Sequence, residues 1–153
     1  MKRILIAYYS HSGATRRVAE HIKESTGGDI YEIQELEPYP RDYSAVVNQA
    51  KKEIAAGHKP SLNGELPDAA DYDVIFIGSP NWWSTIAPPA ATFLSSLDLT
   101  GKRIIPFITH GGGGLGRTIS DIKKLCQAAA VDDGLDATRS ERIPEFVKSL
   151  NLK

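Results

Sequence analysis

Short apolar runs alternate with amphipathic stretches along the whole chain, and this alternation constrains the fold more than any other feature. Strand-like runs cover about residues 3–9, 74–77 and 102–109, and weaker ones cover 29–34 and 130–137. The stretches between them repeat apolar residues at helical spacing. Strands that alternate with helices pair in parallel, with helices on both faces of the sheet. The pattern therefore predicts a three-layer, doubly wound α/β fold with about five strands.

The intervening stretches predict five helices. The first ends near residue 25, before two glycines, and the others cover about 43–56, 88–97, 115–129 and 143–150. No repeat, low-complexity tract or linker interrupts the 153 residues, so we expect a single domain over 1–153.

Bulk composition excludes several classes of protein. The net charge is −1 and the sequence pI is about 6.4, which argues against a nucleic-acid-binding or membrane-surface protein. The single cysteine rules out an internal disulfide and suits a reducing compartment. No apolar run approaches the roughly 20 residues that span a bilayer. A cytoplasmic location is expected.

The segment after the first strand indicates a phosphate site. Residues 4–7 are apolar, residues 8–15 are mostly small or hydroxylated, and a helical pattern follows. Such a loop presents backbone N–H groups and the hydroxyls of Ser10, Ser12 and Thr15 near the positive end of a helix dipole.

Two further segments at strand ends complement this loop. Residues 78–84 carry the adjacent Trp82 and Trp83, and residues 109–116 include four consecutive glycines. Ligands of open parallel sheets bind beyond the carboxyl ends of the strands. If the three segments meet there, phosphate donors, aromatic rings and closely approachable backbone would together suit a flat aromatic phosphate ester.

The sequence resembles the flavodoxin family over its whole length. The pattern Tyr8-x-Ser10-x-x-Gly13-x-Thr15-x-x-x-Ala19-x-x-Ile22 is similar to that family's phosphate-loop signature, and the segments at Tyr39–Tyr43, Trp82–Trp83 and Thr109 resemble a flavodoxin-like branch. The resemblance implies a 2-1-3-4-5 strand order and bound FMN. It implies that the phosphate contacts Ser10, His11, Ser12, Gly13, Ala14 and Thr15. It implies that the isoalloxazine lies among Ser79, Pro80, Asn81, Trp82, Trp83, Ser84, Thr109, His110, Gly111, Gly112, Gly113 and Gly114.

Some residues have more than one interpretation. Adjacent loop side chains point in different directions, so one tryptophan is expected to stack on the flavin, with Trp82 slightly preferred. Arg16 and Arg17 oppose the helix dipole, and either face solvent or screen the phosphate. The glycines from Gly111 to Gly116 also fit a dinucleotide fingerprint with Asp132 or Asp133 as its acidic partner, although a run of glycines matches many patterns.

Other reactive side chains suggest no separate chemistry. Cys126 lies on the apolar face of its expected helix and is interpreted as core. His21 and His58 are interpreted as surface residues, and no cluster has metal-ligand spacing. The glycines after His110 resemble an esterase oxyanion motif, but no nucleophile turn accompanies them, which disfavours a hydrolase.

Two functional classes remain, an FMN-dependent oxidoreductase and a diffusible electron carrier. The near-neutral charge offers little long-range steering toward a basic partner. His110 and the following glycines provide no aromatic ring to cover the flavin, and Pro80 stiffens the segment where carriers often place a glycine. These features favour an oxidoreductase, with His110 and Asn81 as candidate substrate contacts.

The expected partners follow from that function. They are a redox partner protein, or NAD(P)H together with a small-molecule or quinone acceptor. Aromatics such as Tyr39 or Tyr43 either form a homodimer contact or pack locally.

Overall fold

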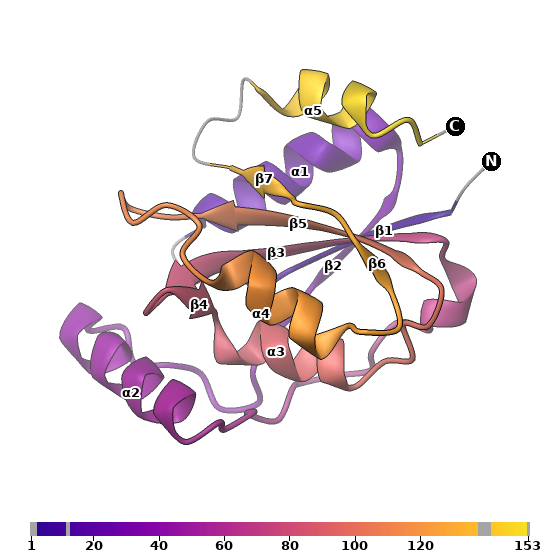
Figure 1. Ribbon diagram of the computed structural model, residues 1–153. Coiled ribbons are helices and arrows are strands. Elements are labelled where there is room, and N and C mark those ends of the chain that lie inside the picture. Colours follow the sequence, from indigo (N-terminus) through magenta and orange to yellow (C-terminus); the bar gives the residue numbers. More distant parts are fainter. Residues whose placement is uncertain (1–2, 12, 138–141, 153) are drawn as a thin grey trace.

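A parallel sheet forms the middle layer of the protein (Figure 1). The computed structural model describes residues 3–11, 13–137 and 142–152. The sheet consists of β1 (Ile4–Tyr8), β2 (Asp29–Glu32), β3 (Val74–Trp82), β5 (Arg103–Thr109) and β6 (Ala130–Val131), in the spatial order β2-β1-β3-β5-β6. Counted along these parallel strands, this is the 2-1-3-4-5 order that the resemblance implies, and the predicted doubly wound fold is confirmed.

The helices cover both faces of this sheet. Helices α1 (Ala14–Thr26) and α5 (Ile143–Ser149) pack together on one face, whereas α3 (Pro88–Ser95) and α4 (Thr118–Leu125) pack together on the other. Helix α2 (Tyr43–Ala55) contacts α3 and β3, and a short 3₁₀ turn covers Ala69–Asp71. None of these described helices is long and apolar enough to cross a membrane.

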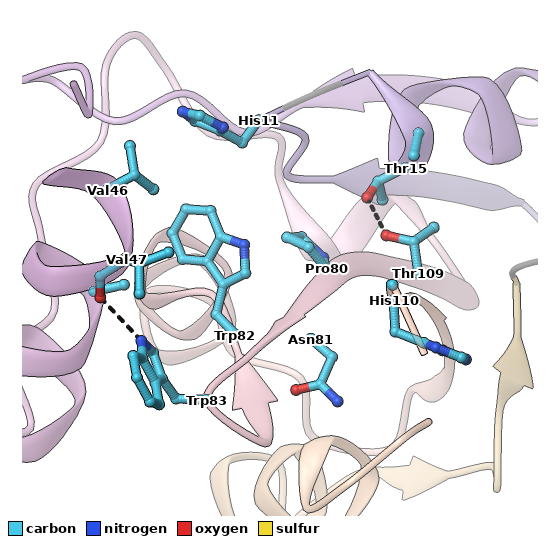
Figure 2. A pocket seen from close by; sticks show the side chains of 13 residues that line it. His11, Thr15, Val46, Val47, Pro80, Asn81, Trp82, Trp83, Thr109 and His110 are labelled. Atoms are coloured by element: carbon cyan, nitrogen blue, oxygen red, sulfur yellow. Dashed lines mark hydrogen bonds between the residues drawn. The ribbon is translucent and has the colours of Figure 1, made fainter. Parts of the chain in front are cut away.

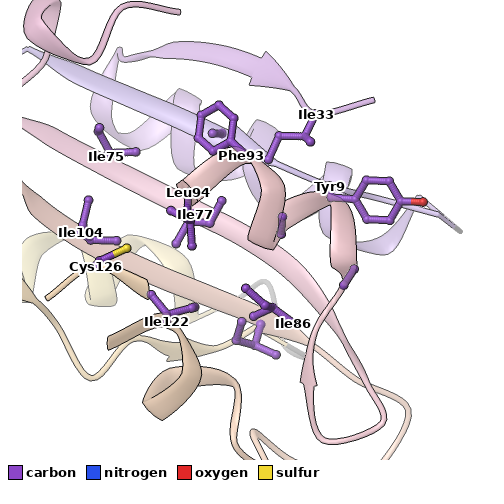
Figure 3. Close-up of a cluster of buried hydrophobic side chains, with 14 of the residues drawn as sticks. Tyr9, Ile33, Ile75, Ile77, Ile86, Phe93, Leu94, Ile104, Ile122 and Cys126 are labelled. Atoms are coloured by element: carbon purple, nitrogen blue, oxygen red, sulfur yellow. The ribbon is translucent and has the colours of Figure 1, made fainter. Parts of the chain in front are cut away.

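Side chains alternate between two buried clusters because successive residues of a strand point to opposite faces. Leu5 and Ala7 of β1 belong to the cluster under α3 and α4, which Figure 3 shows, whereas Ile6 and Tyr8 belong to the cluster under α1 and α5. Gly78 of β3 allows the tightest contact, since a Cβ there would lie 2.3 Å from the Phe107 ring.

Strand β3 is longer than the sequence indicates. The interpretation of 78–84 as a loop is wrong for residues 78–82, which continue the strand, with Pro80 opposite Thr109 of β5. The chain then reverses and Thr85–Ile86 (β4) pairs antiparallel with Asn81 and Trp82. Glycine and proline mark this segment as a turn locally, but pairing with strands on both sides overrides that preference.

The strand-to-helix connection after β5 also differs from prediction. Helix α4 begins at Thr118 instead of residue 115, because Gly116 adopts a positive φ of 54° and packs against Ser84. The expected strand at 130–137 is divided around Gly134 (φ 78°) into β6 and β7 (Leu135–Asp136), which pair with different parts of β5. Strand β7 therefore lies beside the carboxyl end of β5.

Candidate functional site

A cavity of about 590 Å³ lies at the carboxyl ends of β1, β3 and β5 (Figure 2). The three segments that the sequence singles out all contribute to it, and α2 provides a further wall. The lining residues are His11, Ala14, Thr15, Val46, Val47, Ala50, Pro80, Asn81, Trp82, Trp83, Thr109, His110 and Gly111. The predicted meeting of the three segments is thus observed.

The loop after β1 is closed by a short-range hydrogen bond. The Gly13 N–H donates to Ser10 Oγ at 3.0 Å, and Gly13 caps α1 with a φ of 97°. The first N–H groups of an α-helix have no acceptor within the helix, and the first turn of α1 carries no acidic residue. This helix end therefore suits an anion. Ser12 lies outside the described residues.

The two arginines after this loop are exposed. Arg16 forms an ion pair with Glu20 at 3.2 Å, and Arg17 Nε lies 3.4 Å from the Gly13 carbonyl oxygen. Arg16 is thus directed along the helix surface, while Arg17 remains close to the loop. Neither arginine is among the residues that line the cavity.

A buried pair of hydroxyl groups joins the segment after β1 to the end of β5. Thr15 Oγ1 and Thr109 Oγ1 are 2.8 Å apart, and both side chains are buried. Each was predicted to contact the cofactor from its own loop. Their hydrogen bond places the two loops against each other at the floor of the cavity.

The two adjacent tryptophans have different surroundings. Trp82 makes edge contacts with Tyr39 and Tyr9 at centroid distances of 5.3 and 5.7 Å, and with His11 at 5.8 Å. Trp83 is 45% exposed, and its Nε1 donates to the Val47 carbonyl oxygen at 3.0 Å. Both indoles line the cavity, as Figure 2 shows. Other aromatic side chains support the Trp82 indole, whereas the Trp83 indole is partly exposed to solvent.

A contact with a lysine of α2 also holds the Trp83 side chain in place. Lys51 Nζ lies 5.1 Å from the Trp83 ring centroid, a cation–π contact. Trp83 (φ 55°) and Ser84 (φ 67°) are consecutive non-glycine residues with left-handed backbone, a conformation that L-residues adopt at some energetic expense. The contacts of the indole with α2 help to hold this turn.

Buried tyrosines support Trp82 from behind. The Tyr39 hydroxyl donates to the Glu53 carboxylate of α2, and burial together with this hydrogen bond raises the Tyr39 pKa well above its usual range. Burial also strongly raises the Tyr9 pKa. Tyr39 is only 7% exposed and packs locally against Trp82, so it is not an exposed aromatic. Nothing is described of the Tyr43 side chain.

Asn81 presents a buried acceptor without a partner. Its Nδ2 donates to the Gly114 carbonyl oxygen at 2.8 Å, which orients the amide, while its Oδ1 is buried and has no hydrogen-bond partner among the described residues. Buried polar atoms normally have partners, so an orphaned acceptor in a cavity wall points to a ligand donor.

Ser79 and Ser84 do not line the cavity, although the resemblance includes them in the site. Ser79 is fully buried; its Oγ donates to the Pro80 carbonyl oxygen at 2.8 Å and accepts from the Ala87 N–H at 2.9 Å. The Ser84 carbonyl oxygen accepts from the Arg117 N–H at 2.6 Å. Both residues shape the β3–β4 turn from outside the cavity.

His110 lies at the cavity edge with both ring nitrogens engaged. Nδ1 accepts from the N–H groups of Gly112 and Gly114, at 3.0 and 3.2 Å. Nε2 lies 2.9 Å from both carboxylate oxygens of Asp136. Gly111 lines the cavity together with His110, whereas Gly112, Gly113 and Gly114, which the resemblance also includes, are not among the lining residues.

The α2 wall was missed by sequence reasoning. Val46, Val47 and Ala50 line the cavity, and they make this wall apolar. Val46 and Ala50 are four residues apart on one helical face, a pattern that predicts burial but not what the face covers. Only the packing of α2 beside β3 shows that part of this face borders the site.

The remaining reactive groups lie elsewhere. Cys126 is buried as predicted, and burial raises its pKa to about 11. Asp132 pairs with Arg103 at 2.7 Å at the start of β5, and Asp133 pairs with Lys123 at 3.2 Å, so both expected acidic partners of the dinucleotide fingerprint form ion pairs with other residues. In the part of the chain that the structure describes, no group of three or more His, Cys, Asp and Glu side chains is arranged to hold a metal ion.

The fold and cavity together define a class, namely doubly wound α/β proteins that bind a ligand at the carboxyl edge of a parallel sheet beside a helix N-terminus. The family model for flavodoxin matches residues 3–148, so the chain belongs to the flavodoxin family. The search of curated proteins found no match to the chain.

Solved structures similar to the chain support this assignment. A Bacteroides eggerthii protein assigned as a flavoprotein is 30% identical, with a TM-score of 0.88 and coverage of 100% of both chains. A Bacteroides uniformis protein assigned likewise is 28% identical, with a TM-score of 0.87, covering 96% of this chain and 98% of that one. A flavoprotein from Lactobacillus acidophilus, solved in complex with FMN, is 27% identical, with a TM-score of 0.76 and coverage of 88% and 92%.

Proposed function

We propose that this protein binds FMN in the cavity and acts as an oxidoreductase, passing electrons or hydride from a nicotinamide nucleotide or a reductase to a small molecule or quinone. Membership of the flavodoxin family and the similar flavoprotein solved with FMN support the cofactor. When bound, FMN supplies the redox chemistry, and the protein supplies position and electrostatics.

The residues present fit FMN. The uncapped N-terminus of α1 and the hydroxyls of Ser10 and Thr15 suit the phosphate. The buried, unpartnered Oδ1 of Asn81 is the observation that carries the assignment, because a flavin ring has an N–H donor in its pyrimidine portion. Trp82 provides an aromatic wall for a planar ring system.

Two features favour turnover over simple electron carriage. The segment from His110 to Gly114 places no large ring over the cavity, which leaves room for a planar substrate. Residues 78–82 are held by pairing with β5 and β4, so the backbone near the ring has little freedom to reorient with redox state.

Binding is tested first, by fluorescence titration with FMN and, in parallel, with riboflavin. FMN is expected to bind much more tightly, because riboflavin lacks the phosphate that α1 would hold. Equal affinities would overturn the phosphate assignment, and no binding of either flavin would overturn the proposed function as a whole.

Turnover is tested on the FMN-loaded protein with NADH or NADPH and a series of quinones. Steady oxidation of the nicotinamide that depends on the quinone supports the oxidoreductase. Tight FMN binding without turnover, together with electron exchange with a reductase, would overturn it in favour of an electron carrier.

A further inference from the structure

The loop at residues 111–114 consists of four consecutive glycines, so it has no side chain that could hold its shape. Glycine loses more conformational freedom on folding than any other residue. A loop that lines a binding cavity nevertheless needs a defined path. In this protein the neighbouring His110 imidazole supplies the missing contacts.

Two glycine amides converge on one ring nitrogen. Gly112 (φ 123°) and Gly114 (φ 70°) both have left-handed backbone, and both donate to His110 Nδ1, at 3.0 and 3.2 Å. Amides two residues apart form a concavity that resembles the backbone nests that bind anions. Because an imidazole nitrogen accepts only when unprotonated, these bonds require Nδ1 without a proton.

Asp136 selects the tautomer that makes this possible. The proton of the neutral ring is then on Nε2, which donates to the Asp136 carboxylate at 2.9 Å. Asp136 belongs to β7 and is paired with Ile108 of β5, so its position is set by the sheet. A carboxylate behind a histidine commonly fixes both the tautomer and the orientation of the ring. The His110 side chain is only 12% exposed.

The other side of the loop is held by Asn81. Its Nδ2 donates to the Gly114 carbonyl oxygen at 2.8 Å, so Gly114 is fixed at both its N–H and its C=O. The loop is thereby clamped between β3 and β7, with Gly111 left at the cavity wall.

We propose that His110 and Asp136 are positioning residues that give residues 111–114 the shape in which this loop borders the cofactor cavity. The role rests on the proposed FMN site. It differs from the substrate contact suggested for His110 by the sequence, because both ring nitrogens are committed to the protein. His110 therefore neither donates a proton to the substrate nor accepts one from it during turnover.

The central test compares His110→Asn with His110→Leu. The asparagine Oδ1 occupies nearly the place of Nδ1 and keeps an acceptor for the two amides, whereas leucine has similar bulk and no acceptor. His21→Asn on the exposed face of α1 is the matched control for the substitution itself.

Hydrogen exchange of the Gly112 and Gly114 amides, measured by NMR on the FMN-free protein, reports the loop directly. We expect exchange to accelerate at least about tenfold in His110→Leu, while His110→Asn and His21→Asn stay close to the unaltered protein. The ring ¹⁵N shifts are expected to show the neutral Nε2–H tautomer. Unchanged exchange in His110→Leu, or a protonated Nδ1 in the unaltered protein, would overturn the proposal.

FMN affinity gives the functional readout. His110→Leu loses both hydrogen bonds from the glycine amides and should bind FMN about tenfold more weakly than the unaltered protein. His110→Asn retains an acceptor for them, and its FMN affinity should stay within about threefold of that of the unaltered protein. Asp136→Asn, which retains an acceptor for Nε2, should be milder than Asp136→Ala. A fall in kcat for His110→Asn with unchanged FMN affinity and amide exchange would instead assign His110 to the substrate and overturn the proposal.

The two kinds of failure are separable. If the unaltered protein binds no FMN, the proposed function fails. Slow amide exchange that depends on the acceptor at residue 110 would in that case still support the hydrogen-bonded loop.

Discussion

The loop after β1 and the loop after β5 both lead from a parallel strand toward a helix at the same edge of the sheet, but different contacts hold them. In the first loop Ser10 Oγ accepts from Gly13 N–H, three residues away. In the second, Asn81 of β3 and Asp136 of β7 hold His110 and Gly114 across the sheet. The first loop is therefore held by its own serine, whereas the second combines local hydrogen bonds to His110 with contacts from neighbouring strands.

This difference explains what each loop can tolerate. A short-range turn survives as long as its own hydroxyl and glycine are kept. The glycine loop also depends on Asn81 and Asp136, which are far away in the chain, because the glycines themselves have no side chains to restrain it. The following predictions test this contrast, from the largest expected effect to the smallest.

The contact between the two loops should be the most sensitive point. Thr15→Val removes one hydroxyl of the buried Thr15–Thr109 pair and leaves the other without its partner. We expect a loss of about 1–3 kcal/mol in the free energy of unfolding and FMN binding at least about tenfold weaker. Urea unfolding and fluorescence titration measure the two effects. Thr15→Ser, which keeps the hydroxyl, is the control, and equal losses in both variants would refute the role of the pair.

High pH should loosen the strand that leads into the first loop. Burial, and then the hydrogen bond to Glu32, raise the Tyr8 pKa from 10.0 to about 12. The folded state thus favours the neutral phenol, so its stabilising contribution is complete below pH 10 and is lost as the pH rises toward about 12. A shift of this size corresponds to at most about 2–3 kcal/mol.

Urea unfolding at several pH values between 8 and 11.5 measures this loss. Tyr8→Phe lacks the titrating hydroxyl and should be less stable at neutral pH but show a shallower decline above pH 10. The other buried tyrosines, Tyr9 and Tyr39, also have raised pKa values and remain in both proteins. Parallel curves for the two proteins would contradict the assignment to Tyr8.

Backbone conformation distinguishes glycines within the second loop. Gly112 has a φ of 123°, whereas Gly111 has no positive φ, and a Cβ at either position would meet no atom within 4 Å. Gly112→Ala should therefore lower the free energy of unfolding by about 1–2 kcal/mol through backbone strain alone, and Gly111→Ala by much less. Gly13→Ala (φ 97°) in the first loop should resemble Gly112→Ala. Thermal unfolding that ranks Gly111→Ala as the worst of the three would contradict this reasoning.

The link between the β3–β4 turn and α2 should have the smallest effect. Trp83→Phe keeps an aromatic ring but removes the hydrogen bond from Nε1 to the Val47 carbonyl oxygen. We expect a loss of about 0.5–1.5 kcal/mol in the free energy of unfolding, because the indole is partly exposed and water can replace the bond. Faster amide exchange in α2 would accompany it. A loss as large as that of Thr15→Val would mean that α2 is a stronger part of the site than its contacts indicate.

Much of the site was predictable because its signals are local. The apolar run before Ser10 and the helical pattern after Thr15 indicate a strand, a loop and a helix, and the placement of Thr15 and Thr109 in one cavity follows from parallel pairing. The extension of β3 through Pro80 was not predictable, since it depends on partners in β5 and β4. Nor was the apolar wall of α2, which looks like any other buried helical face until its neighbours are known.

By itself, the sequence determined the α/β class, the strand order through its family resemblance, and the position of a phosphate-type loop, because hydrophobic periodicity and turn chemistry are properties of nearby residues. The tertiary structure alone decided that Trp83 reaches Val47, that Asn81 keeps an unpaired buried oxygen, and that His110 is held by Asp136. These are contacts between residues distant in sequence, and no local pattern specifies which donors and acceptors the sheet brings within hydrogen-bonding distance.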